Sequence, residues 1–127
     1  MIGCGSMGGG MALLFAEHGL IVCLNDPSEE NIDSVLTAGE KGGLRDQLEK
    51  HQSYEELCKS LDSPRVFFFS LPHGTVGDKV VDGLHPYLDK GDIIIDAANE
   101  DWENTQRRQG KMLAQGVHYI GMGVSVG

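Results

Sequence analysis

Four short apolar runs along the chain predict buried β-strands. They cover residues 20–24, 65–71, 92–96 and 117–122. Each run is largely continuous rather than alternating with polar residues, which is typical of parallel strands covered on both faces. Segments with helical features separate the runs. This order of elements predicts an α/β domain with a mostly parallel, doubly wound sheet.

The segments between the runs carry signals for helix boundaries. Gly19 is placed to end a helix whose apolar residues have helical spacing, namely Met7, Met11, Leu14 and Phe15. Residues 53–56 (Ser-Tyr-Glu-Glu) form a capping box, which predicts a helix to about residue 61. Two further helices are predicted at about residues 75–88 and 102–115.

Two parts of the predicted sheet are incomplete. Only Met1 and Ile2 precede Gly3, so we expect a truncated first strand and a domain that is incomplete at its N-terminus. Residues 40–51 occupy the place of a third strand, but they are charged and lack β-branched side chains. They predict a helix or loop, and they leave the third strand doubtful.

Glycine is concentrated at the N-terminus in a pattern that suggests a ligand. The chain has 18 glycines in 127 residues, and residues 3–8 (Gly-Cys-Gly-Ser-Met-Gly) match GxGxxG. The pattern directly precedes a predicted helix, whose N-terminal amides attract the pyrophosphate of a dinucleotide. We therefore expect dinucleotide contacts from Gly3, Gly5, Ser6, Met7 and Gly8. The alternative is a plain glycine turn.

Asp26 follows the second strand, where an acid accepts hydrogen bonds from the adenosine ribose in NAD-binding domains. It also predicts an N-cap, with Pro27 at N1 and Glu29 at N3, and both roles can coexist. The first basic residue in the chain is Lys41. The acids expected around a 2′-phosphate are Asp26, Glu29, Glu30 and Asp33. A like-charge contact there costs about 1–4 kcal/mol, which favours NAD over NADP.

Charge and composition exclude several classes of protein. The 19 acidic and 10 basic residues give a formal net charge of −9, which argues against nucleic-acid partners and anionic membranes. No apolar run approaches the roughly 18 residues of a membrane span, and no secretory signal is apparent. We therefore expect a cytoplasmic protein.

The cysteines and histidines do not indicate a metal site. Cys4, Cys23 and Cys58 are too far apart for a CxxC pair, so buried free thiols are expected. The histidines, including His51, have no partners at ligand spacing. We expect no metal.

Three later segments carry a resemblance to a known family. They are residues 91–99 (GDIIIDAAN), residues 104–108 (NTQRR) and residues 121–127 (GMGVSVG). In these the chain resembles the N-terminal cofactor-binding domain of the 6-phosphogluconate dehydrogenase family. The resemblance implies a Rossmann-type fold and an NADP- or NAD-dependent homodimeric enzyme of the pentose phosphate pathway. Such an enzyme oxidatively decarboxylates 6-phosphogluconate to ribulose 5-phosphate.

The resemblance also implies particular site residues. Asn99 matches an asparagine between nicotinamide and substrate, and Ser125 and Gly127 match part of the substrate loop. The further residues implied at the cofactor are Asn25, Leu71, Pro72 and His73. An ordinary loop histidine is the alternative for His73.

Departures from the family pattern limit what the chain is expected to do. Asp26 replaces an arginine that binds the 2′-phosphate in NADP-dependent members. Ala97 and Ala98 replace two glycines, and Val126 replaces a glycine of the substrate loop, where it would crowd a ligand. The family's proton-transferring lysine and glutamate lie in a downstream helical domain outside these 127 residues. We expect no catalytic residue in the chain, and cofactor binding without turnover.

Two alternative functions stay open for the chain. The chain can be the cofactor domain of a 3-hydroxyisobutyrate-type β-hydroxyacid dehydrogenase, or a non-catalytic dinucleotide-binding protein. Trp102 and Tyr119 are expected to be packing residues, with stacking platforms as the alternative. Arg107 and Arg108 are expected on a solvated helix face, with a phosphorylated substrate or a partner subunit as the alternative.

Overall fold

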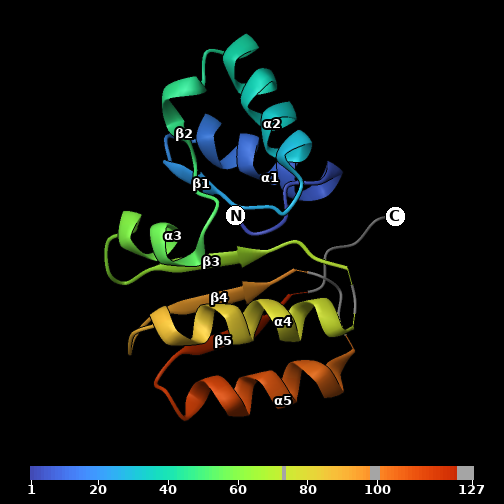
Figure 1. The fold of residues 1–127 in the computed structure, drawn as a ribbon, viewed down its shortest axis with the longest axis vertical. Coiled ribbons are helices and arrows are strands. Elements are labelled where there is room, and N and C mark those ends of the chain that lie inside the picture. The colour runs from blue at the N-terminus through green and yellow to red at the C-terminus, as the bar shows by residue number, and fades with distance from the viewer. Residues whose placement is uncertain (73, 98–100, 123–127) are drawn as a thin grey trace. The chain divides into compact units, whose positions relative to one another are not determined.

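The computed structural model describes residues 1–72, 74–97 and 101–122, and it contains two compact units. The first unit is Met1–Ser60 and the second is Leu61–Gly127. Figure 1 shows helices and strands in both units. Because all strand pairs are parallel in the described residues, the predicted α/β class is confirmed.

The first unit contains a two-stranded parallel sheet, three α-helices and one 3-10 helix. Its elements are α1 (Ser6–Glu17), β1 (Val22–Leu24), α2 (Glu29–Lys41), the 3-10 helix η1 (Arg45–Gln47), β2 (Leu48–Lys50) and α3 (Tyr54–Ser60). Ile2 forms an isolated parallel bridge with Asn25, which is the reduced first strand expected from the sequence. The helix start predicted from the capping box is confirmed, because α3 begins at Tyr54 and the backbone N–H of Glu56 donates to Ser53 Oγ at 3.1 Å.

The prediction of helix or loop for residues 40–51 is wrong in its last part. Residues 48–50 form β2, with Leu48 opposite Val22 and Lys50 opposite Leu24. Leu48 is buried beside Gly39 of α2, where an added Cβ would lie 2.4 Å from Leu48 Cδ1. Glu49 and Lys50 are exposed, so the strand needs only one apolar residue.

The predicted N-cap of α2 is displaced by two residues. Ser28 is the cap, and its Oγ accepts from the backbone N–H of Asn31 at 3.3 Å. Glu29 and Glu30 then lie in the first turn, where carboxylates interact favourably with the helix dipole. Asp26 does not cap α2, and its carboxylate accepts a hydrogen bond from the glycine-rich turn instead.

The helices α1 and α2 approach closely at Gly9. An added Cβ there would lie 2.9 Å from Val35 Cγ2 and 3.2 Å from the carbonyl oxygen of Cys4. The neighbouring Gly10 has nothing within 4 Å of an added Cβ. Gly9 therefore sets the distance between α1, α2 and the turn that precedes α1.

We expect Gly9→Ala to lower the free energy of unfolding by about 1–3 kcal/mol, because the added methyl group has no room. Gly10→Ala is the matched control. It lies in the same helix in open space, so alanine is expected to stabilise by about 0.4–1 kcal/mol. Urea denaturation followed by circular dichroism measures both values. Equal effects of the two substitutions would contradict the close approach at Gly9.

The second unit contains a three-stranded parallel sheet in the order β3-β4-β5. Its elements are β3 (Val66–Phe69), α4 (Thr75–Leu84), the 3-10 helix η2 (His85–Tyr87), β4 (Ile93–Asp96), α5 (Trp102–Leu113) and β5 (His118–Gly121). Helices α4 and α5 lie along this sheet (Figure 1). The predicted helices at 75–88 and 102–115 are confirmed with shorter C-terminal ends.

A buried ion pair joins the beginnings of β3 and β4. Arg65 Nη2 lies 2.6 Å from Asp92 Oδ2 and also donates to the carbonyl of Tyr87 at 2.6 Å. Burial opposes ionisation of Asp92, but hydrogen bonds from Arg65 and from the backbone N–H of Asp89 outweigh it and lower its pKa. This pair lies at the N-terminal ends of the two strands, whereas ligands of parallel sheets usually bind at the carboxyl ends.

Within the described ranges, no helix is both long enough and apolar enough to cross a membrane.

Candidate functional site

The glycine-rich turn is held against the end of β1. Gly3 has a φ of 95°, a conformation that L side chains rarely adopt, and its backbone N–H donates to the carbonyl of Asn25 at 2.9 Å. Gly5 is extended and forms the N-cap of α1. The turn therefore leads directly into the N-terminus of a helix, as the sequence pattern predicts.

The N-terminus of α1 has the properties of an anion site. In the described part of the chain, no side chain caps this helix, and its first turn has no acid. The early amides of a helix have no partner within the helix, and they carry the positive end of its dipole. These amides belong to Ser6, Met7 and Gly8. The arrangement suits the pyrophosphate of a dinucleotide.

Cys4 lies inside the turn without adding charge to it. Its side chain is buried, and burial raises the pKa of the thiol to about 11. The thiol is therefore neutral at pH 7. A thiolate here would repel a pyrophosphate, whereas the neutral thiol does not.

Asp26 ties the turn to α2. Its Oδ2 accepts from the backbone N–H of Cys4 at 2.7 Å and from Asn31 Nδ2 at 3.3 Å. Its Oδ1 accepts from the backbone N–H of Ser28 at 2.8 Å. A carboxylate oxygen accepts about two hydrogen bonds, so Oδ1 retains capacity for a ribose hydroxyl. Asp26 thus has a structural role that is compatible with the predicted binding role.

Asn25 is committed to the loop that follows β2. Its Nδ2 donates to the carbonyls of His51 at 2.8 Å and Gln52 at 3.3 Å, and the residue is buried. Its side chain therefore fixes the backbone beyond β2. A direct contact of Asn25 with cofactor stays a prediction.

In the second unit, the predicted cofactor loop follows β3. Leu71 is half-buried and Pro72 is exposed at this strand end. The next described residue is Gly74, which has a φ of 92° and is the N-cap of α4. The predicted residues that lie outside the described residues are His73, Asn99, Ser125 and Gly127, together with Ala98 and Val126.

Arg108 is hydrogen-bonded to the end of this loop at Gly74. The prediction that Arg108 lies on a solvated helix face is wrong. The residue is 1% exposed. Its Nη2 donates to the carbonyl of Gly74 at 2.8 Å, its Nε to Asp78 Oδ1 at 3.0 Å, and its Nη1 lies 3.4 Å from Asp96 Oδ2. Asp96 also accepts from the hydroxyl of Tyr119. The cluster of Asp78, Asp96, Arg108 and Tyr119 links both helices to two strands of this unit.

The ionisable groups of this cluster shift one another's pKa values. Hydrogen bonds from Arg107 and Arg108 lower the pKa of Asp78 to about 2. Burial, together with Asp96, raises the pKa of Tyr119, so its hydroxyl remains a donor. An added Cβ at Gly77 would lie 2.7 Å from the Arg108 guanidinium, so this glycine provides the space for it.

The sequence contains one signal for this cluster. Asp96 ends an apolar strand, and a buried carboxylate requires a partner.

Tyr119 packs in the core as predicted, at 5% exposure. The same prediction is wrong for Trp102, which is 68% exposed at the start of α5. Arg107 is exposed as predicted and pairs with Asp78 at 2.8 Å.

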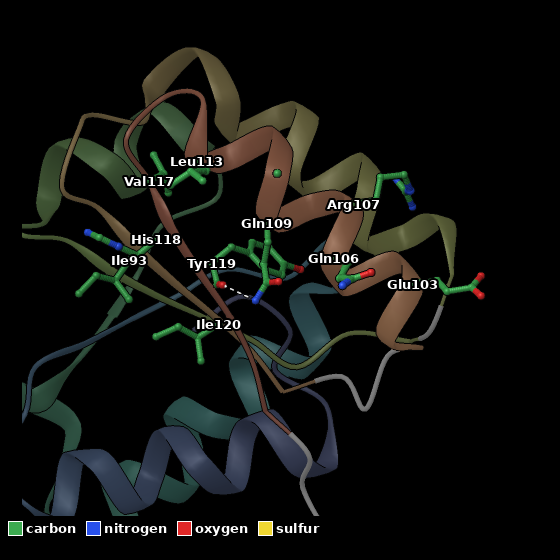
Figure 2. Close-up of a pocket in the computed structure, with 11 residues that line it drawn as sticks. Ile93, Glu103, Gln106, Arg107, Gln109, Leu113, Val117, His118, Tyr119 and Ile120 are labelled. Carbon is green, nitrogen blue, oxygen red and sulfur yellow. Dashed lines mark hydrogen bonds between the residues drawn. The ribbon is translucent and has the colours of Figure 1, made fainter.

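A hollow of about 1100 Å³ runs along β5 and α5 (Figure 2). Its lining includes Leu113, His118 and Ile120, and Gln109 Nε2 donates across it to the carbonyl of Tyr119 at 3.1 Å. None of the described residues predicted to bind the cofactor lines it. Ligands of parallel sheets bind at the carboxyl ends of strands, whereas this hollow follows the side of the outermost described strand. We therefore do not assign the dinucleotide to it.

Two predictions about cysteine and histidine have different outcomes. All three cysteines are buried and none forms a disulfide, as predicted. The absence of a metal stays a prediction, although the structure groups His51 with two other potential ligands. His51 Nε2 lies 3.2 Å from Glu49 Oε1, and ligand atoms of Cys23, Glu49 and His51 lie within 4.8 Å of one another. Strand register brings Cys23 to Glu49, which is two residues before His51, and the sequence alone does not display that register.

Comparison with known proteins establishes the family. The sequence model described as the NAD binding domain of 6-phosphogluconate dehydrogenase matches residues 1–127. The chain belongs to this family. It is 34% identical to the decarboxylating 6-phosphogluconate dehydrogenase of Caenorhabditis elegans, covering 100% of the chain and 26% of that protein. It is 35% identical to the Escherichia coli enzyme, with the same coverage. The chain thus spans about a quarter of the length of these relatives.

Solved structures agree with the family assignment. Plasmodium falciparum 6-phosphogluconate dehydrogenase, studied with its cofactor NADP⁺ and its substrate 6-phosphogluconate, matches with a TM-score of 0.88 and 27% identity. The match covers 99% of this chain and 27% of that one. Mycobacterium tuberculosis 3-hydroxyisobutyrate dehydrogenase matches with a TM-score of 0.84, 19% identity and coverage of 99% and 40%, which is a likeness of fold. The predicted Rossmann-type fold and NAD(P)-binding class are confirmed.

Proposed function

We propose that the chain supplies the dinucleotide-binding domain of a decarboxylating 6-phosphogluconate dehydrogenase, and that it prefers NAD to NADP. The observation that carries the proposal is the glycine turn, whose Cys4 amide is hydrogen-bonded to Asp26 at 2.7 Å. The proposed whole enzyme is a cytoplasmic homodimer of the pentose phosphate pathway. Its proton-transferring lysine and glutamate are proposed to lie in a helical domain beyond residues 1–127.

The proposed roles follow from the groups that the chain presents. The amides at the start of α1 bind the pyrophosphate, and Asp26 Oδ1 accepts from the adenosine ribose. By resemblance to the family, the loop at residues 71–73 is proposed to bind the cofactor, and Asn99 is proposed to contact both nicotinamide and substrate. Ser125 and Gly127 contribute to the substrate loop. A bound dinucleotide would supply the hydride acceptor, and the residues proposed above would bind and orient it.

The preference for NAD follows from local charge. Glu29 and Glu30 occupy the first turn of α2, and Asp26 replaces the arginine of NADP-dependent members. The first basic residue of the sequence is Lys41, at the other end of the same helix. A 2′-phosphate beside Asp26 would therefore meet like charge, and the cation of Lys50 is already 3.7 Å from Glu29 Oε1.

We expect the purified chain to bind NADH in a calorimetric titration and to give no NAD reduction with 6-phosphogluconate. Binding needs the turn and Asp26, whereas decarboxylation needs a general base and acid that we place outside the chain. Absorbance at the NADH band, against a control without protein, measures turnover. Reduction above that control would contradict the placement of the catalytic groups. Absence of NADH binding would contradict the proposed role of the turn.

The two alternatives predict different results. A non-catalytic dinucleotide-binding protein would bind NADH, but its affinity would not respond to 6-phosphogluconate. A 3-hydroxyisobutyrate-type domain would respond to 3-hydroxyisobutyrate instead. Repeating the NADH titration with each compound in excess therefore separates the alternatives from the proposed function.

A further inference from the structure

We propose that Cys23, Glu49 and His51 form a binding site for a zinc ion on the sheet of the first unit. The site is distinct from the residues proposed for the dinucleotide. Ligand atoms of the three side chains lie within 4.8 Å of one another, and Glu49 Oε1 lies 3.2 Å from His51 Nε2.

The strand register produces this arrangement. Cys23 in β1 is directly opposite Glu49 in β2. His51 follows β2 two residues after Glu49, so it continues on the same face of the sheet. Lys50 lies between them in sequence and points to the other face, where its Nζ is 3.7 Å from Glu29 Oε1. The three potential ligands therefore converge, and the nearest lysine in sequence is directed elsewhere.

The donor set matches the chemistry of zinc. A thiolate, an imidazole and a carboxylate are all common zinc ligands, with bond lengths of about 2.0–2.3 Å. Tetrahedral bonds of that length separate ligand atoms by about 3.3–3.7 Å. The observed contact of 3.2 Å between Glu49 and His51 is already close to this range. Zinc binding would require the other ligand atoms, which lie within 4.8 Å of one another, to move closer to this separation. The soft sulfur favours zinc over magnesium or calcium.

The surrounding backbone holds the ligands in place. The N–H of His51 donates to the carbonyl of Leu24 at 2.9 Å, and the carbonyl of His51 accepts from Asn25 Nδ2 at 2.8 Å. Cys23 Sγ lies 3.4 Å from Ser60 Oγ, and that hydroxyl donates to the carbonyl of Leu57 at 2.7 Å. In the metal-free state, Ser60 Oγ can accept a hydrogen bond from the Cys23 thiol. On zinc binding the thiol proton leaves to solvent, because zinc binds the thiolate.

The accessibility of the site also suits an ion that arrives from solvent. The Cys23 side chain is buried, His51 retains 20% side-chain exposure and Glu49 retains 48%. The sulfur is thus protected while the other two ligands border the solvent. Three protein ligands leave a fourth position for water, as in zinc sites that are not purely structural.

Titration of the full chain with Co²⁺ tests the proposal. Cobalt bound by Cys23 is expected to give a thiolate-to-metal charge-transfer band in the near ultraviolet, saturating at one equivalent. Zinc then displaces cobalt and abolishes the band. Cys23→Ser is expected to remove the band. His51→Ala and Glu49→Gln are expected to weaken zinc binding at least about tenfold, the loss that even outer-shell substitutions cause.

Matched controls separate the site from general metal binding. Cys58→Ser removes another buried thiol, and His118→Ala removes an exposed strand histidine in the other unit. Both are expected to keep the band and the zinc affinity of the unmodified chain. The proposal is overturned if the unmodified chain gives no band, if Cys23→Ser keeps it, or if His51→Ala binds zinc as tightly as His118→Ala does. Because His51 borders the solvent, its substitution remains informative even if Cys23→Ser does not fold.

Discussion

Arg108→Ala is expected to lower the free energy of unfolding by about 3–5 kcal/mol, the cost of breaking a buried ion pair by removing one partner. The substitution leaves the buried carboxylate of Asp96 without its arginine, and it removes the donors to Asp78 and to the carbonyl of Gly74. The cavity left by the side chain adds to this loss. Urea denaturation followed by circular dichroism is the appropriate measurement.

Arg107→Ala is the matched control for this prediction. Arg107 is the adjacent residue in α5 and also pairs with Asp78, but its side chain is 54% exposed. Exposed ion pairs contribute about 0–1 kcal/mol, so this variant is expected to remain close to the unmodified chain. Similar losses for the two variants would show that burial of Arg108 is not what stabilises the second unit.

The second large effect concerns cofactor choice. We expect the unmodified chain to bind NADH at least about fivefold more tightly than NADPH, because one like-charge contact costs about 1–4 kcal/mol and 1.4 kcal/mol corresponds to about tenfold in affinity. Asp26→Asn is expected to bring the two affinities closer together, since it removes the charge beside the 2′-phosphate. Parallel titrations with NADH and NADPH measure the ratio of the two dissociation constants.

Glu17→Gln is the control for Asp26→Asn. It removes one negative charge from the same unit, but Glu17 is exposed at the C-terminal end of α1. The ratio of the two dissociation constants is expected to stay unchanged. A preference for NADPH in the unmodified chain, or an equal shift in both variants, would contradict the role given to Asp26.

Local patterns in the sequence predict the fold better than they predict the contacts of its polar residues. The apolar runs predict β1, β3, β4 and β5, and the GxGxxG pattern and the capping box predict two helix starts, because these features depend on neighbouring residues. Local patterns do not predict β2, because its stability comes from pairing with β1 and from one buried side chain, Leu48.

Local sequence patterns also fail to predict the polar contacts of the candidate sites. Asp26 has an N-cap sequence, but its carboxylate is used by the backbone N–H of Cys4, which is 22 positions away in sequence. Arg108 has a polar helical context, but its partners are Asp78 and Asp96 on other elements. Cys23 and Glu49 become neighbours only through strand register. Contacts of this kind follow from topology, which a single sequence does not display.

The hydrogen bonds of Asp26 have a consequence for how cofactor specificity can change. An arginine at this position would bring a cation for a 2′-phosphate, but it could not accept from the amides of Cys4 and Ser28. A change to NADP by this substitution would therefore also loosen the turn that binds the pyrophosphate. In this chain, the route to a different cofactor requires compensating substitutions around α2 before or together with the arginine.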